Sequence, residues 1–276
     1  MDRIAHARRF LDKKGRDVER AQFAYHFGDG TLDALVETLA RYQNADGGFG
    51  RGLEPDIGAP ESNPFATELA LLICVRARVP LEEPLIQRTL GYLEDTQGED
   101  GTWRFSDEVL QGEMAPWFAA WTWPSLNPAC AIAGLLRELG AGSEGMVHRV
   151  EELFDELARP EDLLGDEFYT IQPYAFYFLP RWEHPLRQLY LSGIVWWLTA
   201  QRAQGKLADA GHFFEFVRSP DTDVARLLPP TCTTTELDRL EAEQSPDGGW
   251  PSPYAEHWRG PATVSAMLVL KEFGRV

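Results

Sequence analysis

Two carboxyl side chains, Glu54 and Asp56, stand two residues apart in a short loop. A carboxyl group buried among apolar side chains has a raised pKa, so it can hold a proton and donate it to a substrate. Asp56 is the preferred donor, because Pro55 restricts the backbone on both sides and can fix the direction of the next side chain. In the alternative interpretation, Glu54 forms an ion pair with Arg51 and Asp56 caps a turn before Ser62.

Three tryptophans, Trp117, Trp121 and Trp123, lie in a segment bracketed by Pro116 and Pro124. The two prolines predict that this segment lies outside a regular helix. Aromatic rings stabilise carbocations through their quadrupole, stack on sugars or simply fill a core. These side chains are therefore candidate substrate contacts, and plain packing is the alternative.

Two further groups of residues are candidate substrate contacts. Tyr174 and Tyr177 belong to an aromatic cluster, and His257, Trp258 and Arg259 precede the last apolar segment. Arg259 is the candidate for binding an anionic group such as a diphosphate. Its alternative role is a surface ion pair, which is common for an arginine at a helix end.

A seven-residue pattern, Q-x-x-D-G-[GT]-[FW], occurs three times, beginning at Gln43, Gln97 and Gln244. The first two copies are 54 residues apart and the last two 147, which is three units of 49. A unit of about 50 residues suits two helices and their connections, because helices average about 11–12 residues with a long tail. The spacing predicts decayed copies near residues 146 and 195, and five to six helix pairs in all.

Each copy of this motif is flanked by two predicted helices of different character. The preceding segment is amphipathic, with apolar residues at i, i+3, i+4 and i+7, which predicts one face in water. The following segment is apolar on every side, which predicts full burial. The buried helices begin near Ala66, Ala129 and Ala262. This alternation predicts an all-α fold: a single α/α toroid with two concentric layers of helices, as one domain over residues 1–276.

The motif itself is typical of a structural turn. A glycine permits positive φ after the preceding helix, and the aspartate can accept backbone N–H bonds within the turn. The aromatic residue can pack back on the helix. We therefore expect Asp46, Asp100 and Asp247 to be structural rather than catalytic.

The motif resembles the QW repeat of squalene–hopene cyclases and the equivalent repeat of protein prenyltransferase β-subunits. More closely, YQNADGGFG over residues 42–50, followed by GLEPD over residues 52–56, looks like a group of bacterial single-domain prenyltransferase-like proteins without an established reaction. The resemblance implies an α/α toroid and a hydrophobic or prenylated small molecule as ligand. It implies no particular activity.

Two site motifs of these families can be compared with the sequence. Squalene–hopene-type cyclases protonate an alkene with D-x-D-D, of which Asp221-Thr222-Asp223 lacks the fourth acid. Protein prenyltransferases bind zinc through Asp, Cys and His, but here the last buried helix begins without a histidine. No D-x-C pair accompanies His257. We therefore expect neither a metal nor another cofactor.

The composition bears on location and partners. Acidic residues number 43 against 26 basic ones, a formal net charge of −17, which repels nucleic acid and anionic lipid. The three cysteines form no C-x-x-C pair, as expected in a reducing compartment. The first 20 residues are charged throughout, and no apolar run reaches the roughly 20 residues of a spanning helix. The sequence predicts a cytoplasmic protein without nucleic-acid binding or integral membrane association, and it leaves any protein partner unknown.

Three functions remain open at this point. The first is an isoprenoid-handling protein, as a metal-independent, acid-initiated terpenoid cyclase with Asp56 or Glu54 as proton donor. The second is a non-catalytic ligand-binding or scaffold protein. The third is a carbohydrate-active enzyme, because (α/α) barrels also host acid pairs and sugar-stacking aromatic side chains. A deep, dry aromatic cavity would favour the first, a filled barrel the second, and a wide groove with two facing carboxylates the third.

Overall fold

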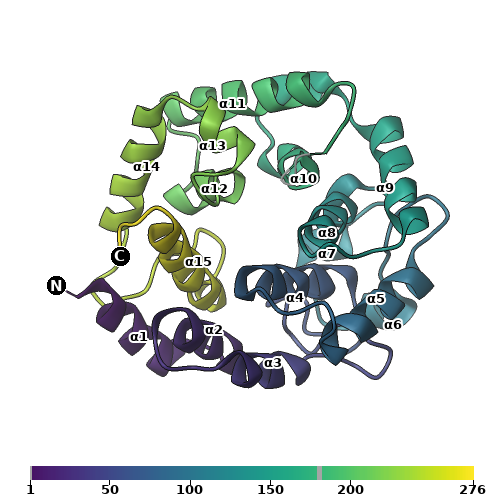
Figure 1. Ribbon diagram of the computed structural model, residues 1–276, viewed down its shortest axis with the longest axis horizontal. Helices are drawn as coiled ribbons and strands as arrows, with labels where there is room; N and C mark the ends of the chain where they lie inside the picture. Colours follow the sequence, from purple (N-terminus) through teal and green to yellow (C-terminus); the bar gives the residue numbers. More distant parts are fainter. Residues whose placement is uncertain (1, 179–181) are drawn as a thin grey trace. The chain divides into compact units, whose positions relative to one another are not determined.

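The computed structural model of the protein describes residues 2–178 and 182–276, which fold into helices joined by turns (Figure 1). Within these ranges there is no strand, and the extended pairings are two isolated bridges. The all-α prediction is confirmed. The chain divides into two compact units, Leu32–Arg159 (the central unit) and Met1–Thr31 with Pro160–Val276 (the terminal unit).

Both units are built mainly of helices. Those of the central unit are α3 (Leu32–Ala40), α4 (Pro64–Ala77), α5 (Pro84–Thr96), α6 (Asp107–Gln111), α7 (Pro116–Ala119), α8 (Leu126–Glu138) and α9 (Glu144–Leu157). Those of the terminal unit are α1 (Arg3–Lys14), α2 (Asp17–Phe27), η1 (Pro160–Leu164), α10 (Phe168–Phe178), α11 (Arg187–Ala203), α12 (Ala210–Phe216), α13 (Asp223–Leu227), α14 (Pro230–Ala242), η2 (Glu256–Trp258) and α15 (Arg259–Glu272). Across the described residues, no helix combines the length and apolarity needed to cross a membrane.

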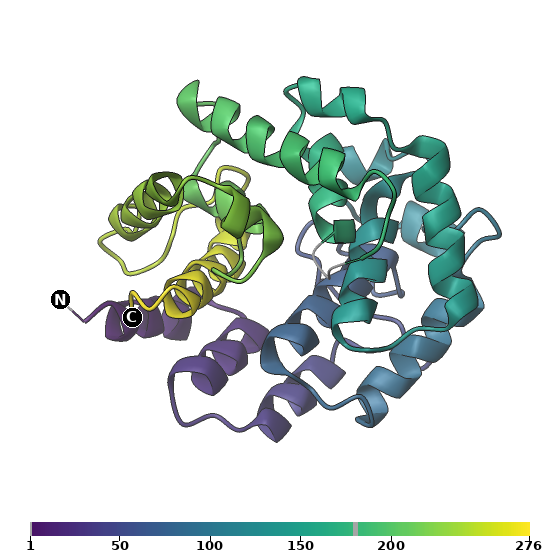
Figure 2. The same cartoon turned by 45° about the horizontal axis from the view of Figure 1, so that its top comes forward.

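Three helices bury most of their surface, as their all-round apolarity predicted. In α8 every residue from Pro128 to Leu136 is buried, and α8 packs against α4 inside the central unit. In the terminal unit, α15 is buried over most of its length and lies beside α1 and α2 (Figure 1 and Figure 2). By contrast, α5 and α9 bury one face only, as predicted for amphipathic helices. The helices that begin near Ala66, Ala129 and Ala262 are therefore buried as expected.

All three copies of the motif form the same turn, in which the glutamine side chain joins two helices. Its amide nitrogen donates to the carbonyl of the glycine after the aspartate, at 2.9 Å from Gln43, 3.2 Å from Gln97 and 2.9 Å from Gln244. The same nitrogen donates to a carbonyl of a second helix: α5, α9 and α1 respectively. An arginine of that second helix donates back to the glutamine oxygen. These arginines are Arg88, Arg149 and Arg3.

The glycine of this turn must lack a side chain. Gly47 has a φ of +92°, and a Cβ there would come within 2.2 Å of the Arg88 carbonyl oxygen. Gly248 has a φ of +100°, and a Cβ there would come within 2.2 Å of the His6 carbonyl oxygen. The predicted aspartate role is also confirmed, since Asp46, Asp100 and Asp247 each accept the backbone N–H two residues on, at 3.0–3.2 Å.

The predicted positions of the decayed copies are wrong. Residues 146 and 195 lie inside α9 and α11, whose C-terminal turns follow Leu157 and Ala203. Equal spacing fails because the connections differ in length. After the second motif the chain forms two additional short helices, α6 and α7, before it reaches α8.

The third copy of the motif fastens the C-terminal part of the chain to its N-terminal helix. Arg3 on α1 donates to the side chain of Gln244 at 3.1 Å and to the carbonyl of Glu241 at 2.9 Å. Trp250 is buried, and its ring N–H donates to the carbonyl of Leu240 near the end of α14 at 2.7 Å. Sequence-distant segments of the terminal unit are thus joined at one turn.

Replacing Gln244 by Ala should lower the melting temperature by several degrees, because the turn loses its hydrogen bonds to Gly248 and to α1, a loss of about 1 kcal/mol. Thermal unfolding followed by circular dichroism measures the change. The exposed Gln111→Ala variant is the matched control and should unfold with the wild type. Equal melting temperatures for all three proteins would show that the turn contributes no stability.

Candidate functional site

The acid pair from the sequence lies next to the aromatic segment, but one acid is engaged in its own turn. Glu54 is buried, and its carboxylate accepts the backbone N–H of Asp56 at 3.3 Å. The carbonyl of Asp56 accepts the N–H of Ala115 at 2.8 Å, and Ile57 pairs with Met114 in an isolated bridge. The loop therefore runs alongside the residues that precede α7. The roles of the two acids as proton donors stay a prediction.

The predicted aromatic segment is partly helical, which corrects the expectation that it lies outside regular structure. Pro116 begins the short helix α7, since a proline fits the first position of a helix. Trp117 on this helix is 52% exposed. Trp121 and Trp123 instead pack against a buried cluster around Phe65, Phe105 and Phe118. Their contacts support the packing alternative, whereas Trp117 is accessible.

Tyr174 and Tyr177 lie in the interior of the terminal unit, each only 1% exposed. The Tyr174 hydroxyl donates to the carboxylate of Asp162, and the ring of Tyr177 packs beside that of Trp182 at 5.3 Å between centroids. Both side chains are therefore core residues in this structure, and their role as substrate contacts stays a prediction without support from their exposure.

Arg259 makes ion pairs, as in its alternative role, and its binding of an anionic group stays a prediction. Its guanidinium donates to Asp247 at 2.7 Å and to Glu256 at 3.2 Å, and it lies 4.6 Å from the ring centroid of Phe10. The hydrogen bond to Asp247 raises the pKa of Arg259 further above its ordinary range. His257 and Trp258 are in η2, directly before this arginine, with His257 exposed and Trp258 half-buried.

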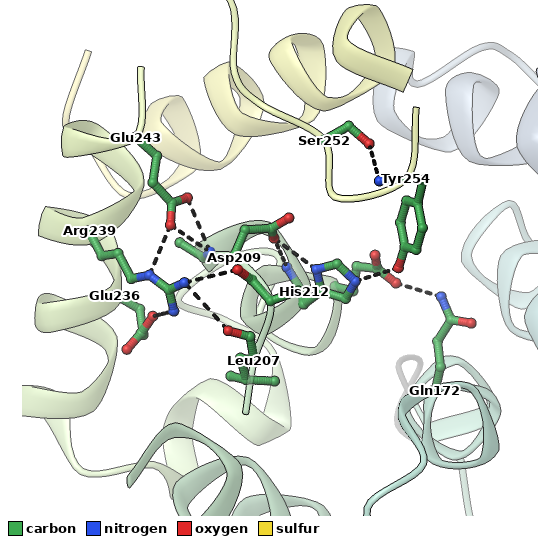
Figure 3. Close-up of polar contacts among 12 residues, drawn as sticks. Gln172, Leu207, Asp209, His212, Glu236, Arg239, Glu243, Ser252 and Tyr254 are labelled. Carbon is green, nitrogen blue, oxygen red and sulfur yellow. Dashed lines mark hydrogen bonds and ion pairs between the residues drawn. The ribbon is translucent and has the colours of Figure 1, made fainter. Parts of the chain in front are cut away.

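A different group of polar side chains forms a continuous chain in the terminal unit, of which Figure 3 shows Asp209, His212 and Tyr254. Asp209 faces Nδ1 of His212 at 2.8 Å, and Nε2 of His212 faces the Tyr254 hydroxyl at 2.5 Å. The Tyr169 hydroxyl donates to the oxygen of Tyr254. His212 is buried, whereas Tyr169 and Tyr254 are 51% and 48% exposed. We call these four residues the Asp–His–Tyr chain. It leads from a half-buried carboxylate and a buried imidazole to two accessible hydroxyls.

The short helix α12 positions the Asp–His pair. Asp209 is its N-cap and accepts the backbone N–H of His212 at 2.9 Å, so one carboxylate both starts the helix and orients the imidazole. Helix α14 holds this helix start in place. Glu243 accepts the N–H of Ala210 at 3.2 Å, and Arg239 donates to Glu243 and to loop carbonyls beside Ala210.

The electrostatic environment favours a charged Asp–His pair. Burial opposes ionisation of both groups, but their mutual hydrogen bond and attraction outweigh it. The pKa of His212 is therefore raised above its ordinary value, and that of Asp209 is lowered. Burial raises the pKa of Tyr254 to about 12, so its hydroxyl stays protonated at neutral pH.

A second carboxyl group lies close to His212. Glu215 is one turn further along α12, is partly buried and accepts a hydrogen bond from the amide of Gln172 on α10. Burial raises the pKa of Glu215, although attraction to His212 and the bond from Gln172 oppose this. Asp209 and Glu215 therefore differ in protonation behaviour, as paired acids in catalytic sites do.

The Asp–His–Tyr chain can move a proton from His212 to Tyr254. Because a carboxylate only accepts, Nδ1 of His212 carries a hydrogen that faces Asp209. When His212 is protonated, Nε2–H donates to the oxygen of Tyr254, whose own hydrogen is then available to a substrate. Once Tyr254 has given up that proton, His212 can replace it through Nε2. The arrangement can therefore act as a general acid.

Two cavities lie among the described residues of the terminal unit. One, of about 100 Å³, borders His212 and is lined by Phe168, Trp197 and Lys206 among others, room for about three water molecules. The other is an open cleft of about 790 Å³ at the start of α11, lined mainly by charged side chains such as Arg187 and Asp223. Neither is a deep aromatic chamber. Among the described residues, no three His, Cys, Asp or Glu side chains are grouped so that they could hold a metal ion.

Comparison of the chain with protein-family models, with curated proteins and with solved structures finds no match. The function must therefore be inferred from the chain's own residues.

The sequence contained one detectable part of this site. Asp209-Ala210-Gly211-His212 has an N-cap residue and a histidine three positions later, the spacing at which a capping carboxylate can reach a side chain of the first turn. Tyr254 lies 42 residues further on, and Tyr169 43 residues before His212. No local pattern connects residues so far apart.

An Asp209→Asn variant should lower the pKa of His212, because asparagine can still cap α12 but carries no charge to stabilise the imidazolium. NMR titration of the His212 ring measures this: the wild type should titrate above 6.5 and the variant lower. The stability that His212 protonation contributes is complete below its unfolded-state pKa and is lost as the pH rises through the raised folded-state value. The melting-temperature difference between the two proteins should therefore shrink as the pH rises. An exposed-site variant, Asp221→Asn, should change neither quantity, and an unchanged midpoint in Asp209→Asn would refute the coupling.

Proposed function

We propose that the protein is an enzyme that uses the Asp–His–Tyr chain as a general acid. One observation supports this above the others: a buried histidine, paired with the half-buried Asp209, hydrogen-bonds to Tyr254, a tyrosine that is itself half-exposed. Purely structural histidines need no accessible partner. Here the proton path ends where a substrate can reach it.

The acid strength of the Tyr254 hydroxyl limits the type of reaction that the site can catalyse. A tyrosine with a pKa of about 12, backed by an imidazolium, can protonate an oxygen leaving group as its carbon–oxygen bond breaks, while a water molecule adds to the carbon and loses a proton to solvent. It is too weak to protonate an alkene, which requires an activated carboxylic acid. The Asp–His–Tyr chain therefore fits cleavage of a carbon–oxygen bond and does not fit the start of a terpenoid cyclisation.

The surroundings favour a neutral, hydroxyl-bearing ring compound such as a glycan. The two accessible tyrosines offer ring faces for stacking and hydroxyls for hydrogen bonding, with 6.5 Å between their centroids. The net charge of −17 disfavours polyanionic substrates. Of the three functions considered from the sequence, the carbohydrate-active enzyme is thus the one that this site supports.

We also propose that the fold is an α/α toroid of the terpenoid-cyclase and prenyltransferase β-subunit type. The support is the repeated motif turn and the alternation of one-sided helices, such as α5 and α9, with buried ones, such as α4 and α8. A cytoplasmic location is proposed because all three cysteines are free thiols and buried.

The acid-initiated cyclase remains the second candidate, and one observation favours it. Glu54 is buried in a loop that runs beside the segment bearing Trp117, which is the neighbourhood an alkene-protonating acid needs. A non-catalytic binding protein is the remaining alternative. Activity measurements on variants of Tyr254, Asp56 and Glu54 distinguish these two alternatives from the general-acid enzyme.

Against a panel of neutral oligosaccharides and aryl glycosides, Tyr254→Phe and His212→Gln should each lose about 100-fold or more of the wild-type rate, since general acid catalysis contributes at least that much. Tyr169→Phe should lose less, because this hydroxyl donates to Tyr254 and does not itself supply the proton to the substrate. Tyr25→Phe on α2 is the control and should keep full activity. The rate should fall as the pH rises through the pKa of His212, and Asp209→Asn should move that fall to lower pH. Full activity in Tyr254→Phe would refute the proposal.

For the cyclase candidate, wild-type protein and Asp56→Asn are incubated with polyprenes and prenyl diphosphates, and products are analysed by gas chromatography and mass spectrometry. Cyclised product from the wild type and none from the variant would assign the proton donor to Asp56. Equal product from both would exclude Asp56, and the same comparison with Glu54→Gln would then test the other acid.

A further inference from the structure

Helix α12 places a second carboxyl group beside the Asp–His–Tyr chain. Glu215 follows His212 by three residues, so the two side chains leave the helix on the same face, with Cβ atoms about 5–6 Å apart. The Tyr254 hydroxyl contacts the same imidazole through Nε2. Burial is the main cause of the raised pKa of Tyr254, and the negative charge of Glu215 adds to it. Glu215 is therefore close enough to act on the proposed acid.

One oxygen of Glu215 is held in place and the other is open. The amide nitrogen of Gln172 on α10 donates to Oε2 of Glu215. Oε1 has no hydrogen-bond partner among the described residues, and it is not one of the fully buried polar atoms that lack a partner. Both side chains are half-buried. The carboxylate is thus fixed in direction, while Oε1 stays able to accept a proton.

Glu215 and the two accessible tyrosines belong to one surface. Helix α10 packs against α12, and Tyr169 lies three residues before Gln172 on α10, so these two side chains share a face. Tyr169 contacts Tyr254, and Gln172 contacts Glu215. A compound that stacks on the tyrosines and reaches the Tyr254 hydroxyl therefore lies beside the Glu215 carboxylate.

We propose that Glu215 is a second catalytic residue, the general base that takes a proton from the water molecule that attacks the substrate. This inference rests on the proposed function, which requires such a water. The water oxygen bonds to the carbon and gives one proton to Oε1 of Glu215. The carbon–oxygen bond breaks, Tyr254 protonates the departing oxygen, and His212 returns a proton to Tyr254. Glu215 then releases its proton to solvent and His212 takes one up, so one water is consumed and two hydroxyl groups are formed.

The surroundings of Glu215 suit a base better than a nucleophile. Burial raises its pKa, although attraction to His212 and Arg218 and the bond from Gln172 oppose this, and Asp209 adds repulsion. A general base works best with a pKa near the working pH. A carboxylate that attacked the carbon itself would later have to leave it again, and a raised pKa makes a poorer leaving group.

Aryl glycosides whose phenols differ in acidity separate the base from the acid. Glu215→Gln should lose about 100-fold or more of the rate with every leaving group, because the water must be activated in each case. Tyr254→Phe should lose most with weakly acidic phenols and least with dinitrophenol, which departs without a proton. Glu272→Gln, which changes an exposed carboxyl on α15, is the control and should keep the wild-type rate. Circular dichroism confirms that each variant is folded.

Azide tests the role of Glu215 directly, because azide attacks carbon without losing a proton and so needs no base. Sodium azide should raise the rate of Glu215→Ala on a dinitrophenyl glycoside about 10-fold or more, recovering part of the lost catalysis. The product should be a glycosyl azide, identified by mass spectrometry. The rate of Tyr254→Phe should not respond to azide.

The outcomes distinguish this inference from the proposed function on which it rests. A wild type inactive on every glycoside would overturn both. A rate that depends on Tyr254 but is unchanged in Glu215→Gln would overturn the base alone. A covalent adduct on Glu215, found by mass spectrometry with a fluorinated glycoside that traps such intermediates, would also overturn it. Should Glu215→Ala not fold, the leaving-group series decides, since a loss in Glu215→Gln confined to weakly acidic phenols would contradict a base.

Discussion

The structure depends on one repeated contact, the bridge that a motif glutamine makes between its own turn and a second helix. The amide of Gln43 donates to Gly47 in its turn and to Leu85 on α5, and Arg88 closes the contact from that helix. This is possible because glycine allows the turn to lie against the carbonyl of Arg88. A buried glutamine with every polar atom bonded stabilises the contact, whereas an unbonded one would cost more than it contributes.

The candidate site depends on the third copy of this turn. Tyr254 lies in the loop between Trp250 and α15, and Arg259 at the end of that loop donates to the carbonyl of Trp250 and to Asp247 of the motif. The loop is thus tied at both ends, which limits where the tyrosine hydroxyl can be. Arg259, which the sequence suggested as an anion site, contributes by holding this loop.

Periodicity predicted the helices well because burial is a property of a whole helix face. The apolar runs around Ala66, Ala129 and Ala262 became buried helices, and the motif became a turn with the expected aspartate contacts. The site was predicted poorly, because it depends on single side chains brought together from distant segments. Tyr174, for example, was a candidate ligand contact and lies in the core. The sequence cannot show which side of a helix faces the interior when both sides carry aromatic residues.

Asp209 shows how a fold element and a chemical function can share one side chain. As the N-cap of α12 it needs only an oxygen that accepts a backbone N–H, which asparagine also supplies. As the partner of His212 it must be charged, because only a carboxylate raises the pKa of the imidazole. An uncharged cap would therefore suffice if the helix were only structural. The carboxylate is half-buried, and the hydrogen bond and attraction to His212 outweigh the loss of part of its hydration.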